Sequence, residues 1–140
     1  MTDNSNWRDI MGHDAYALDA TKIEVLEARP GYARTRMPVT PQIINGHGNV
    51  HGGAYFTFAD FTAAIASNMH GATTVATNAS ISFLRAVHVN ESELFAEART
   101  VKTGKRMNFM TAEIKDAAGN LIAVFQASSL NVSKDKPGGS

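Results

Sequence analysis

The second half of the chain is dominated by strict alternation of apolar and polar residues. Leu94, Ala96 and Ala98 alternate with charged or exposed positions, and Met110 and Ile114 belong to a second alternating run after a Thr-Gly-Lys turn. A period of two is typical of strands that bury one face. The pattern predicts strands over residues 73–84, 92–102, 106–116 and 121–132.

The first half predicts two more strands and two helices. Residues 20–28 alternate except for a slip at Leu26, which indicates a β-bulge or a strand end. Residues 32–39 alternate with arginines on one face, which should be the solvated face. Apolar residues at helical spacing predict a short helix within residues 1–16. Residues 54–70 are rich in Ala and Phe and apolar all round, which predicts a helix buried on most sides.

The order of these elements favours an α+β fold. One long helix cannot cover both faces of a six-stranded sheet, so an antiparallel sheet curled around that helix is expected. The last four strands are expected to form a meander, and the free edge and outer face of the sheet invite oligomerisation. Residues 1–132 should form a single domain, followed by a polar, disordered tail over residues 133–140.

Charge and composition exclude several classes of protein. Thirteen basic residues balance thirteen acidic ones, whereas a nucleic-acid-binding module normally carries a basic excess, so no nucleic-acid partner is expected. The absence of Cys excludes disulfides, thiolate–metal sites and a Cys nucleophile, and it fits a cytoplasmic location. No run approaches the roughly 18 apolar residues of a membrane-spanning helix, and the N-terminus lacks a signal-peptide pattern.

The loop before the long helix contains the first candidate site. Residues 45–53 read NGHGNVHGG, and the helix should begin near His51. The first backbone N–H groups of a helix have no intrahelical partner and lie at the positive end of its dipole. Glycines there would let a ligand approach closely enough to have a carbonyl oxygen polarised or an anion bound. A tight loop alone would account for the glycines equally well.

Asp60 is the second candidate. It lies about two turns into the apolar helix, and no Lys or Arg shares its face at helical spacing. A buried carboxylate without a partner is costly, and desolvation should raise its pKa. A raised pKa suits a general base or a nucleophile, so a functional role is favoured over a structural one.

Other chemistries fit the sequence poorly. The glycine spacing around Gly46 and Gly48 differs from a dinucleotide fingerprint, and no parallel βαβ unit follows. His47 and His51 with Asp60 could suggest a metal site, but the intervening glycines oppose a continuous helix that presents both rings. No Gly-x-Ser-x-Gly motif occurs. No metal site is therefore expected.

The sequence resembles the hotdog-fold acyl-CoA thioesterases in three features: the loop motif of residues 45–53, Asp60 eight residues after Gly52, and the Phe-Leu-Arg sequence of residues 83–85. The resemblance is greatest to the phenylacetate-degradation (PaaI-type) branch. It extends over residues 25–132 and is most specific in the loop and the helix. It implies the hotdog fold, in which a curled antiparallel sheet wraps around one long central helix.

The resemblance also implies roles for individual residues. Asp60 would be the catalytic carboxylate, and the N–H of Gly52 would hold the thioester carbonyl. His51 and Asn45 would orient the thioester or the water, and Thr77 would assist the carboxylate. The family implies no cofactor, and it implies homodimers that pair into homotetramers with each site built between two subunits.

An acyl-CoA substrate carries phosphates, so basic residues should lie near the mouth of the site. Lys105 and Arg106, at a predicted hairpin turn, are the best candidates for contacts with the CoA phosphates, together with Arg85. A solvated face would explain each of these residues equally well.

The predicted activity is hydrolysis of an acyl-CoA thioester to the free acid and CoA. The acyl group would be aromatic, such as phenylacetyl or hydroxyphenylacetyl, or of medium chain length. The alternative is a non-catalytic acyl-CoA-binding or assembly module on the same fold. A hotdog enoyl-CoA hydratase is a third hypothesis, but no His follows Asp60 at short helical spacing before His70.

Overall fold

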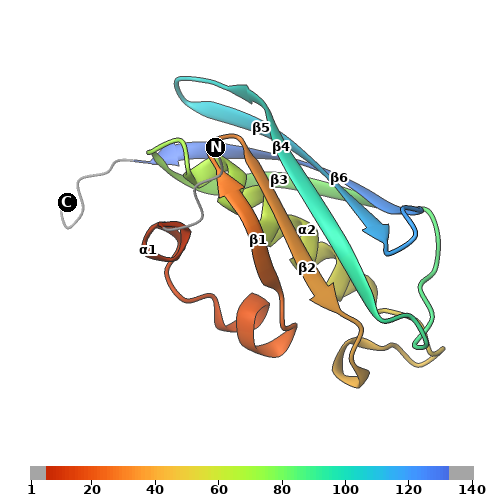
Figure 1. Cartoon of the computed structure of the whole chain (residues 1–140). Coiled ribbons are helices and arrows are strands. Elements are labelled where there is room, and N and C mark those ends of the chain that lie inside the picture. Colours follow the sequence, from red (N-terminus) through yellow and green to blue (C-terminus); the bar gives the residue numbers. More distant parts are fainter. Residues whose placement is uncertain (1–5, 133–140) are drawn as a thin grey trace.

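The computed structural model describes residues 6–132 and contains a six-stranded antiparallel sheet curled around one long helix, α2 (Figure 1). The helices are α1 (Trp7–Met11), the π-helix η1 (Ala15–Ala20), the 3-10 helix η2 (Pro41–Ile43) and α2 (Gly52–Asn68). The strands are β1 (Glu24–Arg29), β2 (Tyr32–Pro38), β3 (Thr73–Phe83), β4 (Glu93–Thr103), β5 (Met107–Asp116) and β6 (Leu121–Val132). The predicted α+β class and the curled sheet are confirmed.

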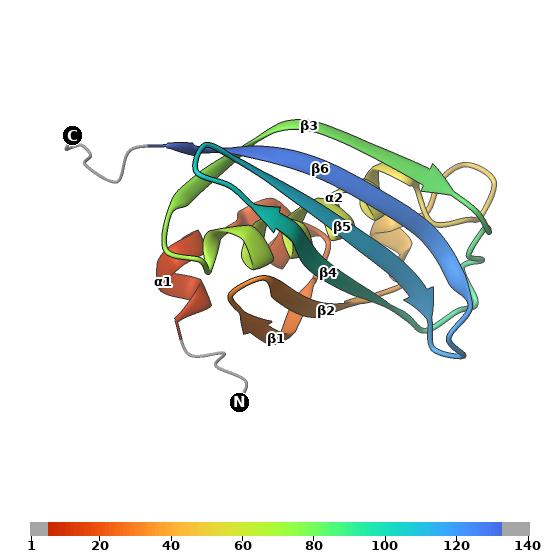
Figure 2. The ribbon, with the colours of Figure 1, turned by 90° about the horizontal axis from the view of Figure 1, so that it is seen from above.

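The strand order is β1-β2-β4-β5-β6-β3, so the predicted four-strand meander is wrong in one respect. β4, β5 and β6 form a meander, but β3 lies beyond β6 at the free edge (Figure 2) and β4 pairs with β2. Tight turns make β4, β5 and β6 neighbours. The longer connection over residues 84–92 lets the chain pass from β3, at the edge of the sheet, to β4, which lies between β2 and β5.

The predicted faces of β4 and β5 agree with the structure, whereas none of the residues of β3 is fully buried within this chain. On β4, the side chains of Leu94, Ala96 and Ala98 are fully buried against α2. On β5, Ala112 and Ile114 are at most 3% exposed. The register of β1 against β2 shifts at Leu26, as the slip in the pattern predicts.

The face of β2 that carries its arginines is less solvated than predicted, because Tyr32 on that face is buried. The guanidinium groups of Arg29 and Arg99 lie 4.1 and 4.8 Å from the centre of its ring, and its hydroxyl donates to Glu97. Desolvation and the hydrogen bond to Glu97 raise the pKa of Tyr32 to about 12.

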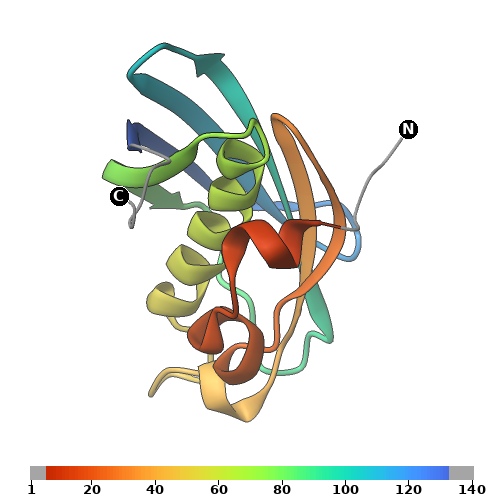
Figure 3. The ribbon, with the colours of Figure 1, turned by 90° about the vertical axis from the view of Figure 1, so that its left-hand side faces the viewer.

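The N-terminal segment differs from the single helix predicted over residues 1–16. α1 is shorter, and η1 follows it as a separate π-helix, so that both lie beside α2 (Figure 3). Trp7 is buried with its ring edge-on to Phe61 of α2 at 6.2 Å. Residues 1–5 and the expected tail, 133–140, lie outside the described residues. Within residues 6–132, no helix is both long and apolar enough to cross a membrane.

Candidate active site

The loop before α2 is folded by the side chain of Asn45. Its amide oxygen accepts hydrogen bonds from the backbone N–H groups of His47 (2.9 Å) and Asn49 (3.1 Å). The backbone N–H of Asn45 donates to the carbonyl of Asn49 at 2.7 Å. The amide oxygen of Asn45 therefore shapes the loop, and only its NH₂ group remains to contact a substrate or a water.

His51 is the N-cap of α2, which begins at Gly52, beside the expected start near His51 and two residues before the predicted range of 54–70. The Nδ1 atom of His51 accepts a hydrogen bond from the N–H of Gly53 at 2.8 Å. In the neutral ring the proton is therefore on Nε2, and the exposed ring presents Nε2–H as a donor. This cap fixes the orientation of His51 and satisfies one of the free amides at the helix start.

The N–H of Gly52 has no acceptor among residues 6–132 and lies at the positive end of the α2 dipole. Gly52 lines a cleft of about 330 Å³ between the loop and the end of β3. A Cβ at Gly52 would lie 3.3 Å from Cζ of Phe83, so only glycine fits below this ring without displacing it. The cleft is lined by Asn45, Asn49, Val50, Gly52, Tyr55, Phe83, Leu84, Arg85 and Ala86.

The structure thus brings three of the predicted site residues, Asn45, Gly52 and Arg85, to one cleft. It directs His51 into a second cavity of about 580 Å³, between the loop and η1, which Tyr16 and Lys22 also line. The start of α2 therefore separates two hollows, one on each side of the Gly52 amide.

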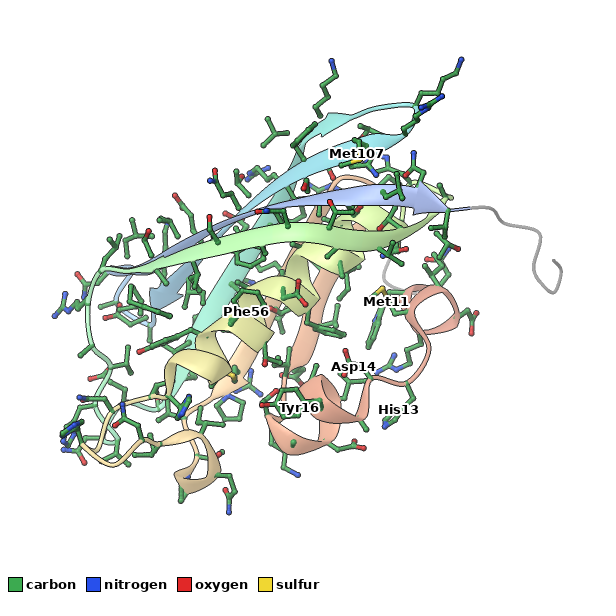
Figure 4. All side chains as sticks on the ribbon, turned by 180° about the vertical axis from the view of Figure 1, so that it is seen from behind. Met11, His13, Asp14, Tyr16, Phe56 and Met107 are labelled. Carbon is green, nitrogen blue, oxygen red and sulfur yellow. The ribbon has the colours of Figure 1, made fainter. Side chains whose placement is uncertain are left out.

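Asp60 lies on the part of α2 that the sheet leaves open. Its neighbours at helical spacing, Gly53, Thr57 and Ala64, are also not fully buried, and together they form an open stripe of mostly small residues. Figure 4 shows this side of the molecule, with Phe56 on α2 and Asp14 on the adjacent N-terminal segment.

The carboxylate of Asp60 has no hydrogen-bond or ion-pair partner in the described part of the chain. Desolvation, and to a smaller extent the charge of Asp14, raises the pKa of Asp60 above its usual range. The raised pKa expected from the sequence is confirmed. A carboxylate in this state is a stronger base than an exposed one.

A single chain does not bring Asp60 to Gly52. Both residues belong to α2, and their separation of eight positions corresponds to about 12 Å along the helix axis. Thr77 lies on the edge strand β3, at a register shift, and its hydroxyl contacts the Ser128 hydroxyl (2.9 Å) instead of Asp60.

Lys105 and Arg106 are exposed in the turn between β4 and β5, at the other end of α2 from Gly52 (Figure 2). Thr103, beside this turn, contacts the ring of His70 just beyond the C-terminus of α2. Since α2 has 17 residues, about 25 Å separates its two ends. Within one chain, Arg85 therefore lies near the N-terminal end of α2 and the other two basic residues lie near the C-terminal end.

Two residues of this region were missed by the sequence reasoning. Tyr55 lies one turn after Gly52 and lines the same cleft, with its ring 5.7 Å from that of Phe83. The helical spacing from Gly52 could have identified it. Asp14 is the N-cap residue of η1, and no local sequence signal connects it to Asp60. Within residues 6–132, no three His, Asp or Glu side chains are grouped as a metal site would require.

Comparisons with known proteins agree with this geometry. Residues 47–123 match the family model described as the thioesterase superfamily. Acyl-coenzyme A thioesterase PaaI of Escherichia coli (strain K12) is 33% identical over 121 residues, which cover 84% of this chain and 86% of that protein.

Solved structures show the same architecture. The E. coli PaaI protein from the phenylacetic acid degradation operon gives a TM-score of 0.85 at 31% sequence identity, with 91% of each chain covered. Thioesterase superfamily member 2 of zebrafish gives a TM-score of 0.78 at 27% identity, covering 91% of this chain and 94% of that chain. The chain therefore belongs to the thioesterase superfamily and is a thioesterase with the hotdog fold that the resemblance implied.

Proposed function

We propose that this protein hydrolyses acyl-CoA thioesters to the free acid and CoA, with aromatic acyl groups such as phenylacetyl or hydroxyphenylacetyl, or medium-chain acyl groups, as substrates. The observation that carries the proposal is the unpaired carboxylate of Asp60, with its raised pKa, on the same helix as the free N–H of Gly52. The similarity to an acyl-coenzyme A thioesterase, and to a protein of a phenylacetic acid degradation operon, supports the choice of substrate.

The two groups have complementary roles in this reaction. As general base, the carboxylate of Asp60 takes a proton from the water that attacks the thioester carbonyl carbon. As nucleophile, it attacks that carbon itself. Negative charge then develops on the carbonyl oxygen, where the Gly52 N–H and the helix dipole stabilise it. In the general-base route the water oxygen bonds to the carbonyl carbon while Asp60 takes its proton, and the C–S bond then breaks as the C=O double bond re-forms, with that proton passing to the departing CoA thiolate. In the nucleophile route the Asp60 oxygen displaces the thiolate to give a mixed anhydride, which a water hydrolyses to the free acid and the regenerated carboxylate.

The active site is shared between two subunits. One carbonyl must lie within a few ångströms of both groups, whereas about 12 Å of helix separates them in one chain. Two α2 helices packed antiparallel about a two-fold axis would place Gly52 of one subunit beside Asp60 of the other. The open stripe around Asp60 is made of mostly small residues, which permits such close packing of two helices.

The sheet supports this assembly in two ways. β3 is an 11-residue edge strand, exposed over most of its length, and a second β3 could pair with it across the two-fold axis. The outer face of the sheet carries exposed Val75, Val101, Phe109 and Leu130, which suit a further pairing of dimers into a homotetramer. Thr77 and the Lys105–Arg106 turn would then reach a site to which their own subunit does not bring them.

Mixed dimers test the shared site. Asp60→Asn subunits paired with Gly52→Val subunits, each inactive alone, should regain up to about half of the wild-type activity, because one site collects both lesions and the other is intact. The control pairs wild-type subunits with subunits that carry both substitutions, so that each shared site contains one lesion and activity is lost. A site formed within one subunit would give the opposite pattern and would overturn the proposal.

The activity itself is tested by release of free thiol from a panel of acyl-CoAs. Turnover of aromatic or medium-chain esters, lost in Asp60→Asn, is the expected result. Binding of acyl-CoA without any thiol release would instead support the non-catalytic acyl-CoA-binding module.

A further inference from the structure

The exposed turn between β4 and β5 is fixed by several hydrogen bonds to its backbone. We call Gly104, Lys105 and Arg106 the basic hairpin. Lys105 and Arg106 are exposed, and no carboxylate in the described part of the chain pairs with either of them. The backbone N–H of Gly104 donates to the carbonyl of Met107 at 2.9 Å, and a Cβ at Gly104 would lie only 2.4 Å from the same oxygen. The turn is therefore closed so tightly that only glycine fits.

Asn131, near the end of β6, holds every backbone carbonyl of the basic hairpin. Its side-chain Nδ2 donates to the carbonyls of Gly104 (3.1 Å) and Lys105 (3.0 Å). Its backbone N–H donates to the carbonyl of Arg106 at 2.7 Å. Three consecutive carbonyls are thus fixed by one residue, which leaves the two cationic side chains to extend from a rigid backbone.

A buried polar chain fixes Asn131 in turn. Its Oδ1 accepts from Nδ2 of Asn108 at 2.7 Å, and the same nitrogen lies 3.2 Å from the hydroxyl of Ser129. The Ser129 hydroxyl contacts that of Ser67 near the C-terminal end of α2, also at 3.2 Å. Asn108, Ser129 and Ser67 are each at least 98% buried, so these hydrogen bonds are protected from water.

We propose that Asn131 is a positioning residue that holds the basic hairpin in the conformation that binds the phosphates of CoA. The proposal rests on the function proposed above, because it takes CoA as the leaving group. An ordered backbone matters at this position because long exposed side chains lose conformational freedom on binding, and a mobile turn would add to that loss. Exposed charges that bind phosphate act on substrate affinity and leave the reacting carbonyl unaffected.

Two substrates separate this role from a merely structural one. The first is an acyl-CoA that the wild type hydrolyses, and the second is the same acyl group on N-acetylcysteamine, which keeps the thioester and lacks the phosphates. In Asn131→Ala, KM for the acyl-CoA should rise about threefold to tenfold, with kcat unchanged. KM and kcat for the phosphate-free thioester should equal those of the wild type.

The substitution must also act through the hairpin charges. A Lys105→Ala/Arg106→Ala variant should raise KM for the acyl-CoA, and adding Asn131→Ala should raise it no further, because the charges that Asn131 positions are already absent. Asn68→Ala is the matched control: Asn68 also makes two side-chain bonds to backbone, to Ala64 and Thr74, at the same end of the molecule. Its KM should match the wild type. Asn131→Ser, which cannot reach both carbonyls, replaces Asn131→Ala if the latter does not fold.

Several results would overturn the proposal: an unchanged KM in Asn131→Ala, equal losses with both substrates, or full additivity with the charge variant. A wild-type protein that released no thiol from any acyl-CoA would refute the proposed function separately. Equilibrium dialysis with CoA itself would then decide on the hairpin. Weaker binding of CoA by Asn131→Ala would support its role, whereas unchanged binding, or no binding by the wild type, would overturn it.

Discussion

Asp60→Asn should make the protein less active and more stable at the same time. The substitution keeps the size and polarity of the side chain and removes its charge. As the base or nucleophile is lost, kcat should fall about 10²–10⁴-fold with little change in KM. The gain in stability follows from the environment of the carboxylate, which is desolvated, faces the charge of Asp14 and has no compensating partner in the described residues.

The size of the gain depends on pH in a defined direction. The folded protein raises the pKa of Asp60, so the folded state holds a proton over a range in which the unfolded state has released it. The wild type therefore loses stability as pH rises from the ordinary Asp pKa through the raised folded value. At pH 7 the variant should therefore have the larger free energy of unfolding, because the wild type must keep the Asp60 charge in a desolvated position and the variant carries none. The difference should shrink as pH falls and disappear well below the ordinary Asp pKa of about 3.9, where Asp60 is protonated in both the folded and the unfolded state.

Denaturant unfolding at about pH 3 and at pH 7, at one protein concentration, measures this difference, and thiol release measures kcat. Asp116→Asn is the control. Asp116 accepts hydrogen bonds from the side chain of Asn120 and from backbone N–H groups, which hold its pKa below the usual value. Its removal should cost stability at neutral pH and leave kcat unchanged. Near-wild-type turnover in Asp60→Asn, or a loss of stability at pH 7, would refute the reasoning.

Two further substitutions test the start of α2. In Gly52→Ala the new Cβ would lie 3.3 Å from Cζ of Phe83, and displacement of this ring beside the N–H should lower kcat/KM at least about tenfold. Gly46→Ala, whose Cβ meets no atom within 4 Å, should retain wild-type kinetics. Equal activities of the two variants would contradict the need for glycine at position 52. His51→Asn should keep the helix cap and lose the ring, whereas His51→Ala loses both. The Ala variant should therefore unfold about 1 kcal/mol more easily than the Asn variant while their kcat values are equally reduced, and unchanged kcat in His51→Asn would limit His51 to capping.

The sequence predicted the features that local patterns control. Burial of Leu94 and Ala96 follows from alternation, because each strand must turn one face to the helix whatever its neighbours are. The raised pKa of Asp60 was predictable because no basic residue occurs at helical spacing on α2. The position of β3 was not predictable in this way, since alternation defines the faces of a strand and leaves its neighbours open.

The parts of the site that depend on distant elements were beyond local patterns. Arg85 and Lys105 looked equivalent as basic residues in the second half of the chain, yet the structure places them at opposite ends of α2. Asp14 affects Asp60 only because η1 lies beside α2, and the π-helical form of η1 has no simple sequence signature. The supports of the basic hairpin come from β6, which only the folded sheet brings to the turn.

The open stripe of α2 limits how this gene can change in length during evolution. Inserting or deleting one residue between Phe56 and Asp60 would rotate every later residue by about 100° around the helix axis. An insertion would move Asp60 to the buried position now held by Phe61, and a deletion would move it to the buried position of Ala59, so in either case the carboxylate would leave the open stripe for the core. Homologues that keep the chemistry must therefore keep the spacing from Gly52 to Asp60 unchanged. Differences in length are free to accumulate in exposed connections such as residues 117–120, between β5 and β6.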